Sequence, residues 1–252
     1  PGFRPPGWNP PAQSASSTLQ KVDFNPSEMF HTSQFWLLWG VFLIGCASGL
    51  MIIMKASPIW QSFALFSLKA GIDPAQLNQM ASAGALAVSI LAIFNSLGRI
   101  VWGKISDLAG RKATLVSMFL ICGLTMLAFN SLKPYPLFLA GISLVGLCFG
   151  GFLAVFPAVT ADFFGTKAYG ANYGWMFSAY GLGGLLGPYL AATLMKTSAL
   201  IRITEFSAGQ RETVRSLAVC DYRQAFIVAG ILCLLSAAAL LLLKRPNVKQ
   251  TK

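Results

Sequence analysis

Six apolar runs, each about as long as a bilayer is thick, limit the possible folds of this chain more than any other feature. Crossing about 30 Å of hydrocarbon takes about 20 helical residues. The runs are continuous rather than alternating, which indicates helices and not the strands of a membrane barrel. The predicted spans are residues 35–54, 80–102, 113–132, 136–160, 172–195 and 224–243. We therefore expect an all-α membrane protein with six transmembrane helices.

The composition supports lipid as the environment of these runs. Hydrophobic residues make up 55% of the 252 positions, charged residues make up 11%, and the mean hydropathy is +0.63. A soluble domain carries about 25% charged residues, and disordered chains are poor in apolar residues, so both classes are excluded. The net charge is +11. Because the cations lie mostly between the runs, membrane lipid headgroups or an anionic solute are favoured as partners over nucleic acid.

Candidates for metal, haem or catalytic chemistry are scarce in the sequence. The single histidine, His31, precedes the first run, and no Ser-His-Asp set, phosphate-cradling loop or pair of carboxylates within the membrane is present. Four of the five cysteines lie in apolar runs and none forms a CxxC pair, which is typical of small packing residues. The cysteines are Cys46, Cys122, Cys148, Cys220 and Cys233. We predict no cofactor, no metal, no disulfide and no enzyme activity.

The two ends of the chain differ from the apolar runs. Residues 1–34 begin PGFRPPGWNPPAQSASS, which is rich in Pro, Gly and Ser and predicts a linker before the first span. Residues 244–252, KRPNVKQTK, predict a polar tail. The chain starts at Pro1 without a leader segment, so we expect a fragment of a longer protein, with further membrane helices before the linker.

The distribution of positive charge predicts the orientation in the membrane. An even number of spans places both termini of this chain on one side. The short connection at residues 103–112 on that side contains Lys104, Arg111 and Lys112. Short loops carry most of the positive-inside signal. We therefore predict that both termini and this connection are cytoplasmic.

The connection itself has the sequence GKISDLAGRK. Gly103 and Gly110 permit close helix approach and a tight turn, and Asp107 lies between cations, where it can meet a helix N-terminus. One interpretation is a charged turn that only obeys the positive-inside rule. The pattern G-x-x-S-D-x-x-G-R-K, which ends in Arg111 and Lys112, is more specific. It resembles the signature loop of the major facilitator superfamily, which joins the second and third helices of each six-helix half.

Further segments narrow the resemblance. They are PPGW at residues 5–8, FPAVTADFFGTK at 156–167, NYG at 172–174, and the fifth-run residues Gly181, Gly183, Gly184, Gly187 and Pro188. Together they resemble the C-terminal half of the oxalate/formate antiporter family, a bacterial and archaeal branch that moves small carboxylates. The similarity covers nearly the whole chain except the 196–223 connection. It implies that the six runs are helices seven to twelve of a transporter. A missing N-terminal six-helix half would then form the other wall of a midplane site.

Arg99, near the end of the second run, is the main candidate for substrate binding. An arginine within the bilayer costs about 2.5 to 3.5 kcal/mol on insertion scales and usually faces a wet cavity or a partner. Asn95 lies one turn earlier on the same helical face, and a guanidinium suits bidentate carboxylate binding. Arg99 could instead snorkel to the headgroups. The resemblance implies the binding role, because the family places a substrate-binding arginine here.

The fifth run departs from the family in a way that changes the expected substrate. Oxalate-type members carry a lysine that binds the dicarboxylate together with the arginine, and the matching position here is Tyr180. One fixed cation neutralises a dianion poorly at low dielectric, so we expect a monocarboxylate, with Tyr180 donating a hydrogen bond. Phe177 and Phe149 either wall this site or only pack between helices. Lys55 is either an interfacial snorkelling residue or a second substrate cation.

The sequence thus predicts a secondary active transporter, an antiporter or a proton-coupled symporter, that moves a small organic anion by alternating access across a bacterial or archaeal cell membrane. Glycines four residues apart, as at Gly146 and Gly150, predict close helix packing. Asp107 is expected to contact a helix N-terminus of the other half in one access state. Two alternatives remain: a major facilitator carrier for another small solute, and a six-helix interaction or sensor subunit that does not transport.

Overall fold

The computed structural model describes residues 23–67, 74–206 and 212–244, which form a bundle of long helices and one two-stranded hairpin. The helices are α1 (Pro26–Phe30), α2 (Ser33–Ser67), α3 (Pro74–Ala109), α4 (Arg111–Ala128), α5 (Tyr135–Phe164), α6 (Tyr169–Leu194) and α7 (Arg223–Leu241). A 3-10 turn, η1 (Phe129–Ser131), follows α4, and strands β1 (Lys196–Phe206) and β2 (Glu212–Asp221) join α6 to α7.

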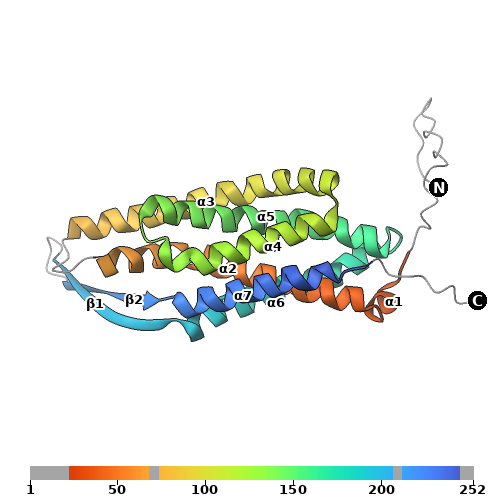
Figure 1. Ribbon diagram of the computed structural model, residues 1–252. Helices are drawn as coiled ribbons and strands as arrows, with labels where there is room; N and C mark the ends of the chain where they lie inside the picture. Colours follow the sequence, from red (N-terminus) through yellow and green to blue (C-terminus); the bar gives the residue numbers. More distant parts are fainter. Residues whose placement is uncertain (1–22, 68–73, 207–211, 245–252) are drawn as a thin grey trace, which may run out of the picture.

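The long helices run side by side, so the bundle has two ends (Figure 1). Helix α1, the α3–α4 turn and the C-terminal end of α7 lie at one end, which we call the turn end. The hairpin lies at the other, which we call the hairpin end. The described chain therefore begins and finishes at the same end of the bundle, as an even number of crossings requires.

Five of the described helices are long and apolar enough to cross a membrane, namely α2, α3, α4, α5 and α7. The remaining long helix, α6, has 26 residues, which is about 39 Å at 1.5 Å per residue. Its many glycines and tyrosines make it less apolar. The all-α membrane fold predicted from the apolar runs is confirmed, and a crossing by α6 stays a prediction based on its length and on its packing along α2.

Helices α2 and α3 extend well beyond the predicted spans. Helix α2 continues past Met54 to Ser67, and α3 runs from Pro74 to Ala109 rather than from Met80 to Trp102. Hydropathy detects the part of a helix that suits lipid, whereas backbone hydrogen bonding continues into more polar ends. Lys55 consequently lies within α2 and not at the end of a helix.

The bundle also begins earlier than the predicted linker boundary at residue 34. Helix α2 starts at Ser33, and the segment before it is bound to the α5–α6 connection. Asp23 Oδ1 accepts hydrogen bonds from the backbone N–H groups of Thr166 (3.0 Å) and Lys167 (3.1 Å). The backbone N–H of Phe24 donates to the carbonyl of Phe164 (2.9 Å). Residues 1–22 of the predicted linker and 245–252 of the predicted tail lie outside the described residues.

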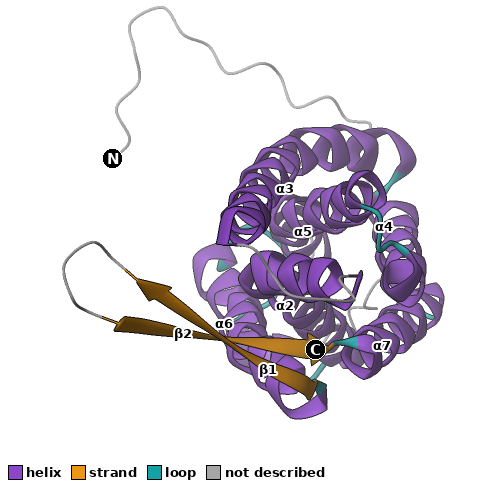
Figure 2. Cartoon of the chain, turned by 90° about the vertical axis from the view of Figure 1, so that its left-hand side faces the viewer, coloured by secondary structure: helices purple, strands orange, loops and turns teal. Residues whose placement is uncertain are grey.

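The 196–223 connection contains a hairpin that the sequence analysis did not predict. Its strands pair antiparallel, from Lys196 with Asp221 to Phe206 with Glu212, with an irregularity between Thr197 and Ala199. At its base, the backbone N–H of Cys220 donates to Ser62 Oγ of α2 (3.2 Å). Figure 2 shows the ribbon projecting sideways from the helices.

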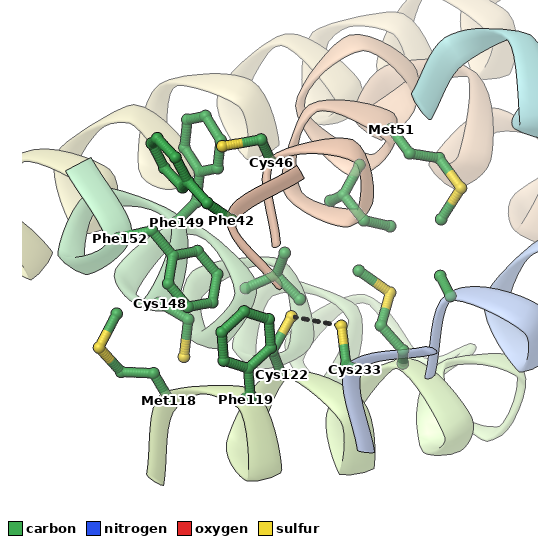
Figure 3. Packing of buried hydrophobic residues seen from close by; sticks show 14 of the residues in the cluster. Phe42, Cys46, Met51, Met118, Phe119, Cys122, Cys148, Phe149, Phe152 and Cys233 are labelled. Atoms are coloured by element: carbon green, nitrogen blue, oxygen red, sulfur yellow. Dashed lines mark hydrogen bonds between the residues drawn. The ribbon is translucent and has the colours of Figure 1, made fainter. Parts of the chain in front are cut away.

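Phenylalanine dominates the buried core between α2, α4 and α5. Phe42 of α2 stacks on Phe156 of α5 with ring centroids 4.1 Å apart, and Phe119 of α4 lies 4.6 Å from Phe152 of α5. All five cysteines are buried free thiols. Figure 3 shows Cys122 and Cys233 among the core rings, with their sulfur atoms 4.0 Å apart. The cysteines therefore serve as small packing residues, as expected.

Glycines set the closest helix contacts, which confirms the packing predicted from their spacing. A Cβ atom added at Gly150 of α5 would lie 1.9 Å from the carbonyl oxygen of Asn95 in α3. One added at Gly98 of α3 would lie 2.1 Å from the Leu147 oxygen in α5. The backbones of α3 and α5 thus touch, and only glycine permits this separation. Gly187 of α6 meets α2 in the same way, because an added Cβ atom there would lie 2.3 Å from the Ala47 oxygen.

Candidate substrate-binding site

Helix α3 presents Arg99 on an exposed face. In the most apolar stretch of α3 only 17% of the residues are buried, against 67% for α5. Arg99 lies ten residues before the end of the helix at Ala109, a distance of about 15 Å, and so deeper in the helix than the predicted span implied. Its side chain is exposed. Among the described residues it forms no ion pair or hydrogen bond, so the guanidinium is available to a ligand.

Asn95, one turn before Arg99, packs against α5. Its Oδ1 atom is buried and accepts no hydrogen bond from the described part of the chain. Gly150 approaches so closely that an added Cβ would lie 2.8 Å from this oxygen. A buried acceptor without a donor costs about 1 to 3 kcal/mol. Asn95 therefore offers an acceptor beside Arg99, but it does not hold the guanidinium, because the two side chains are not hydrogen-bonded.

The three aromatic residues predicted near the site come together from two helices. The rings of Phe177 and Tyr180 on α6 stack at 4.9 Å with an angle of 11° between them. The ring of Phe149 on α5 lies 6.3 Å from that of Tyr180. Phe149 is buried and fills the space beside Gly49 of α2, whereas 39% of Phe177 is exposed. Phe149 is thus a packing residue, while Phe177 and the half-buried Tyr180 can face a ligand.

Helix α5 connects the three aromatic residues with Asn95. Phe149 of α5 contacts Tyr180, and the next residue, Gly150, contacts Asn95. The structure therefore brings four of the five predicted binding residues to one region of the bundle. Arg99 makes no ring contact with this group within the described chain. It lies four residues from Asn95 toward the turn end, a distance of about 6 Å.

The α3–α4 turn depends on Gly110, which has φ +87°. This left-handed conformation is costly for residues with a side chain, so the prediction of a tight turn at Gly110 is confirmed. Gly103 differs from its prediction. A Cβ atom at this position would meet nothing within 4 Å, so within the described chain no helix approaches Gly103 closely.

Arg111 joins the turn to α5. Its Nη1 donates to Asp107 Oδ1 (2.6 Å) and to Ser106 Oγ (2.9 Å), and its Nε donates to Asp162 Oδ2 (2.8 Å). The expected contact of Asp107 with a nearby cation is therefore present. Asp162 was not among the residues predicted to act at this turn. Its position at the end of the fourth span, on the same side of the membrane as the turn, is the signal that could have identified it.

Lys112 joins the same turn to α7. Its Nζ donates to the carbonyl oxygens of Leu241 (2.5 Å) and Leu243 (3.1 Å). Carbonyl groups at a helix C-terminus lack partners within the helix, and a cation there is favourable. Arg111 and Lys112 thus fasten the α3–α4 turn to α5 and α7, and neither is free to bind substrate.

Known proteins with sequences similar to this chain include an antiporter, a carrier and a transporter. The family model described as Major Facilitator Superfamily matches residues 37–252. The oxalate:formate antiporter of Oxalobacter formigenes is 31% identical over 176 residues, which cover 68% of this chain and 38% of the antiporter. Apicoplast pyruvate carrier 1 of Toxoplasma gondii is 28% identical over 165 residues, covering 65% of this chain and 28% of the carrier.

A third relative is monocarboxylate transporter 12 of Rattus norvegicus. It is 24% identical over 167 residues, which cover 65% of this chain and 33% of the transporter. The chain therefore matches less than two fifths of the length of each of these relatives.

Proposed function

Because the chain belongs to the major facilitator superfamily, a family of multi-pass membrane transporters, we propose that it forms helices seven to twelve of a secondary active transporter for a small organic anion. The names of the relatives, which refer to oxalate, formate, pyruvate and monocarboxylates, support a carboxylate substrate. A bacterial or archaeal cell membrane, with both ends of this chain in the cytoplasm, agrees with the basic α3–α4 turn.

The observation that carries this proposal is the guanidinium of Arg99, which pairs with no described residue although it lies within a long apolar helix. A charge in such a helix is costly unless it faces water, a partner or a ligand. The planar guanidinium can donate two parallel hydrogen bonds to one carboxylate. Asn95 adds a buried acceptor one turn away, which suits an ordered water beside the substrate.

The surroundings favour one negative charge on the substrate. Tyr180 supplies a neutral donor where oxalate-type members carry a lysine. Lys55 is not placed to replace that lysine, because it is six residues from Gly49 on α2, a rotation of about 120° away from the side that faces Phe149. A dicarboxylate would thus leave one charge uncompensated, so we propose a monocarboxylate such as formate or pyruvate.

Alternating access then requires this half to move as one body against the missing N-terminal half. The glycine contacts between α3 and α5 and between α2 and α6 hold the half together. At the turn end, Arg111 and Lys112 fasten the α3–α4 turn to α5 and α7. Substrate bound at Arg99 would be carried from one side to the other as the two halves rock.

Uptake into proteoliposomes tests the proposal with the complete transporter, meaning this chain together with its N-terminal half. We expect saturable uptake of radiolabelled formate or pyruvate, weaker competition by oxalate, and no uptake by Arg99→Gln. Binding without flux would support the interaction or sensor subunit instead. Uptake of a neutral solute that carboxylates do not inhibit would support a carrier for another substrate.

A further inference from the structure

Four aromatic residues on α6 form a continuous column that extends beyond the candidate site. They are Tyr169, Tyr173, Phe177 and Tyr180, spaced by three or four residues along the helix. Tyr169 and Tyr173 stack at 5.7 Å with an angle of 4°, and the centroids of Tyr173 and Phe177 are 5.6 Å apart. Phe177 stacks on Tyr180 in turn. Since Tyr169 is the first residue of α6, the column runs from the turn end to the candidate site.

This column is separate from the side of α6 that carries Trp175. Trp175 follows Tyr173 by two residues, a rotation of about 200° that places it on the opposite side of the helix. There it packs on Phe30, and the neighbouring Ser178 accepts a hydrogen bond from Trp39 Nε1 (3.0 Å). Exposed tryptophans of this kind anchor proteins at the membrane interface. The column instead shares its side of the helix with Tyr180, and through Tyr180 it contacts Phe149.

The tyrosine hydroxyls of the column are unused within the described half. By contrast, the hydroxyl of Tyr135, at the start of α5, donates to the Ala83 carbonyl at 2.8 Å. The hydroxyls of Tyr169, Tyr173 and Tyr180 make no such bond to any described residue. All three side chains are half-buried. Ordinary packing needs only the rings, whereas three hydroxyls without partners along one side of a helix form a row of hydrogen-bond donors.

We propose that Tyr173 and Tyr169 line the passage by which the carboxylate moves between Arg99 and the turn end of the bundle. This inference rests on the proposed transport function. The hydroxyl-bearing residues Tyr169 and Tyr173 are about one helical turn or 6 Å apart, and Tyr180 follows about two turns or 10 Å further on. Such neutral donors can hold a carboxylate briefly on its way without the strong attraction of a second cation. Conduction needs binding that is weak enough for release. Stacking also covers the negative ring faces of Tyr169 and Tyr173, so that hydroxyls and ring edges are left for the anion.

Removal of the Tyr173 hydroxyl distinguishes a role in the passage of the carboxylate from a role in its equilibrium binding. In the complete transporter we expect Tyr173→Phe to lower turnover of radiolabelled formate by about threefold to tenfold, the effect of one lost hydrogen bond. Formate affinity at equilibrium should stay within about twofold, because Arg99 and Tyr180 are unchanged. The matched control is Tyr189→Phe on the same helix. Tyr189 is 64% exposed and has no ring contact in the described chain, so its substitution should change neither quantity.

A labelling experiment tests the same passage without requiring transport. Tyr173→Cys should react with a charged, membrane-impermeant methanethiosulfonate applied from the turn-end side, and formate should slow this reaction. The five cysteines of this chain are buried, so this half should give little background, and the unaltered transporter serves as the control. An unreactive cysteine at position 173 contradicts the passage, as does unchanged turnover in Tyr173→Phe or an equal loss of affinity and turnover. If the unaltered transporter takes up no carboxylate, the proposed function fails, and the labelling still shows whether Tyr173 faces water.

Discussion

At the scale of single residues, Arg99 and Tyr180 carry the chemistry of the candidate site. Both carry polar groups, and each is accessible rather than sealed in the core. Phe149 differs, because it is buried between α2, α5 and α6. Substitutions at Arg99 and Tyr180 should therefore change recognition, whereas substitution of Phe149 should first disturb packing.

Arg99→Lys should reduce monocarboxylate uptake by about tenfold to a hundredfold although the positive charge is kept. The planar fork that binds both carboxylate oxygens is lost, and a hydrogen bond to a charged group contributes about 1.5 to 3 kcal/mol. Initial rates of uptake into proteoliposomes measure the effect, with Arg223→Lys at the exposed start of α7 as the matched control. Near-normal uptake by a correctly inserted Arg99→Lys protein would show that Arg99 only snorkels to the headgroups.

Tyr180→Lys should move selectivity from monocarboxylate toward dicarboxylate. The new ammonium group would take the place of the Tyr180 side chain in the candidate site, where it could neutralise the second charge of oxalate. Competition of oxalate against radiolabelled formate measures this change, and Tyr189→Lys provides the same substitution at an exposed site on α6. If oxalate competes equally before and after Tyr180→Lys, position 180 does not match the lysine of oxalate-type members.

At the scale of helices, glycines decide how closely neighbours pack, and charged residues hold the turn. The contrast between Gly150 and Gly174 makes this testable. Gly150 abuts the α3 backbone, whereas a Cβ at Gly174 of α6 would meet nothing within 4 Å. The same substitution should therefore have opposite effects at the two positions.

Gly150→Ala should destabilise the protein by about 1 to 3 kcal/mol, because α3 and α5 must separate to admit the methyl group. Gly174→Ala should be neutral or stabilise by up to about 1 kcal/mol, since alanine favours the helix. For a protein of this size, about 1 kcal/mol corresponds to a shift of about 2 to 4 °C in Tm. Thermal unfolding in detergent measures both variants. Equal Tm values for the two would contradict the close α3–α5 contact.

Asp107→Asn should change the ratio of the two access states by up to about thirtyfold. A charge near a helix N-terminus contributes about 0.3 to 1 kcal/mol, and about 2 kcal/mol when partly buried. The Asp107 side chain is 68% exposed, so its bond to Arg111 contributes little, and a contact with the other half would dominate. Accessibility of engineered cysteines from each side of the membrane measures the ratio, with substrate affinity as the control. If expression falls and the ratio of access states stays the same, Asp107 serves only to orient the turn in the membrane.

At the scale of the whole molecule, α3 presents a large apolar surface that the described residues do not cover. Leu86, Ile93 and Ile100 are 53%, 58% and 71% exposed. Arg99 is also exposed on α3, so a site at Arg99 is open on one side. The relatives are more than twice as long as the part that matches this chain. This supports the proposal that a second half covers α3.

Ile100→Cys should react with a lipid-soluble maleimide in the isolated chain and become protected when the N-terminal half is present. Leu235→Cys on α7, at a position that is 59% exposed, should react in both cases, because the proposal leaves α7 facing lipid. Mass spectrometry of the labelled protein measures both. Equal labelling of position 100 with and without the other half would mean that α3 faces lipid and not the partner half.

The sequence alone determined the fold class and the main candidate residues. An unbroken apolar run must satisfy its own backbone in lipid, so helices follow from the runs without knowledge of any contact. The tight turn at Gly110 and the isolated charge of Arg99 are likewise local properties, since each depends on the residue type and its immediate neighbours. The 196–223 connection carried no such local signal, and its hairpin was not predicted.

Only the tertiary structure decided which of these residues act together. Asp162 pairs with Arg111 across 51 residues, and Phe149 reaches the α6 column from a different helix. The full lengths of α2 and α3 could not be predicted either. Hydropathy identifies the part of a helix that lies in lipid, but it does not show how far the helical hydrogen bonds continue. Contacts of this kind depend on the angle and separation of packed helices. Those are set by many distant residues at once, such as Gly98 against Leu147 and Gly150 against Asn95.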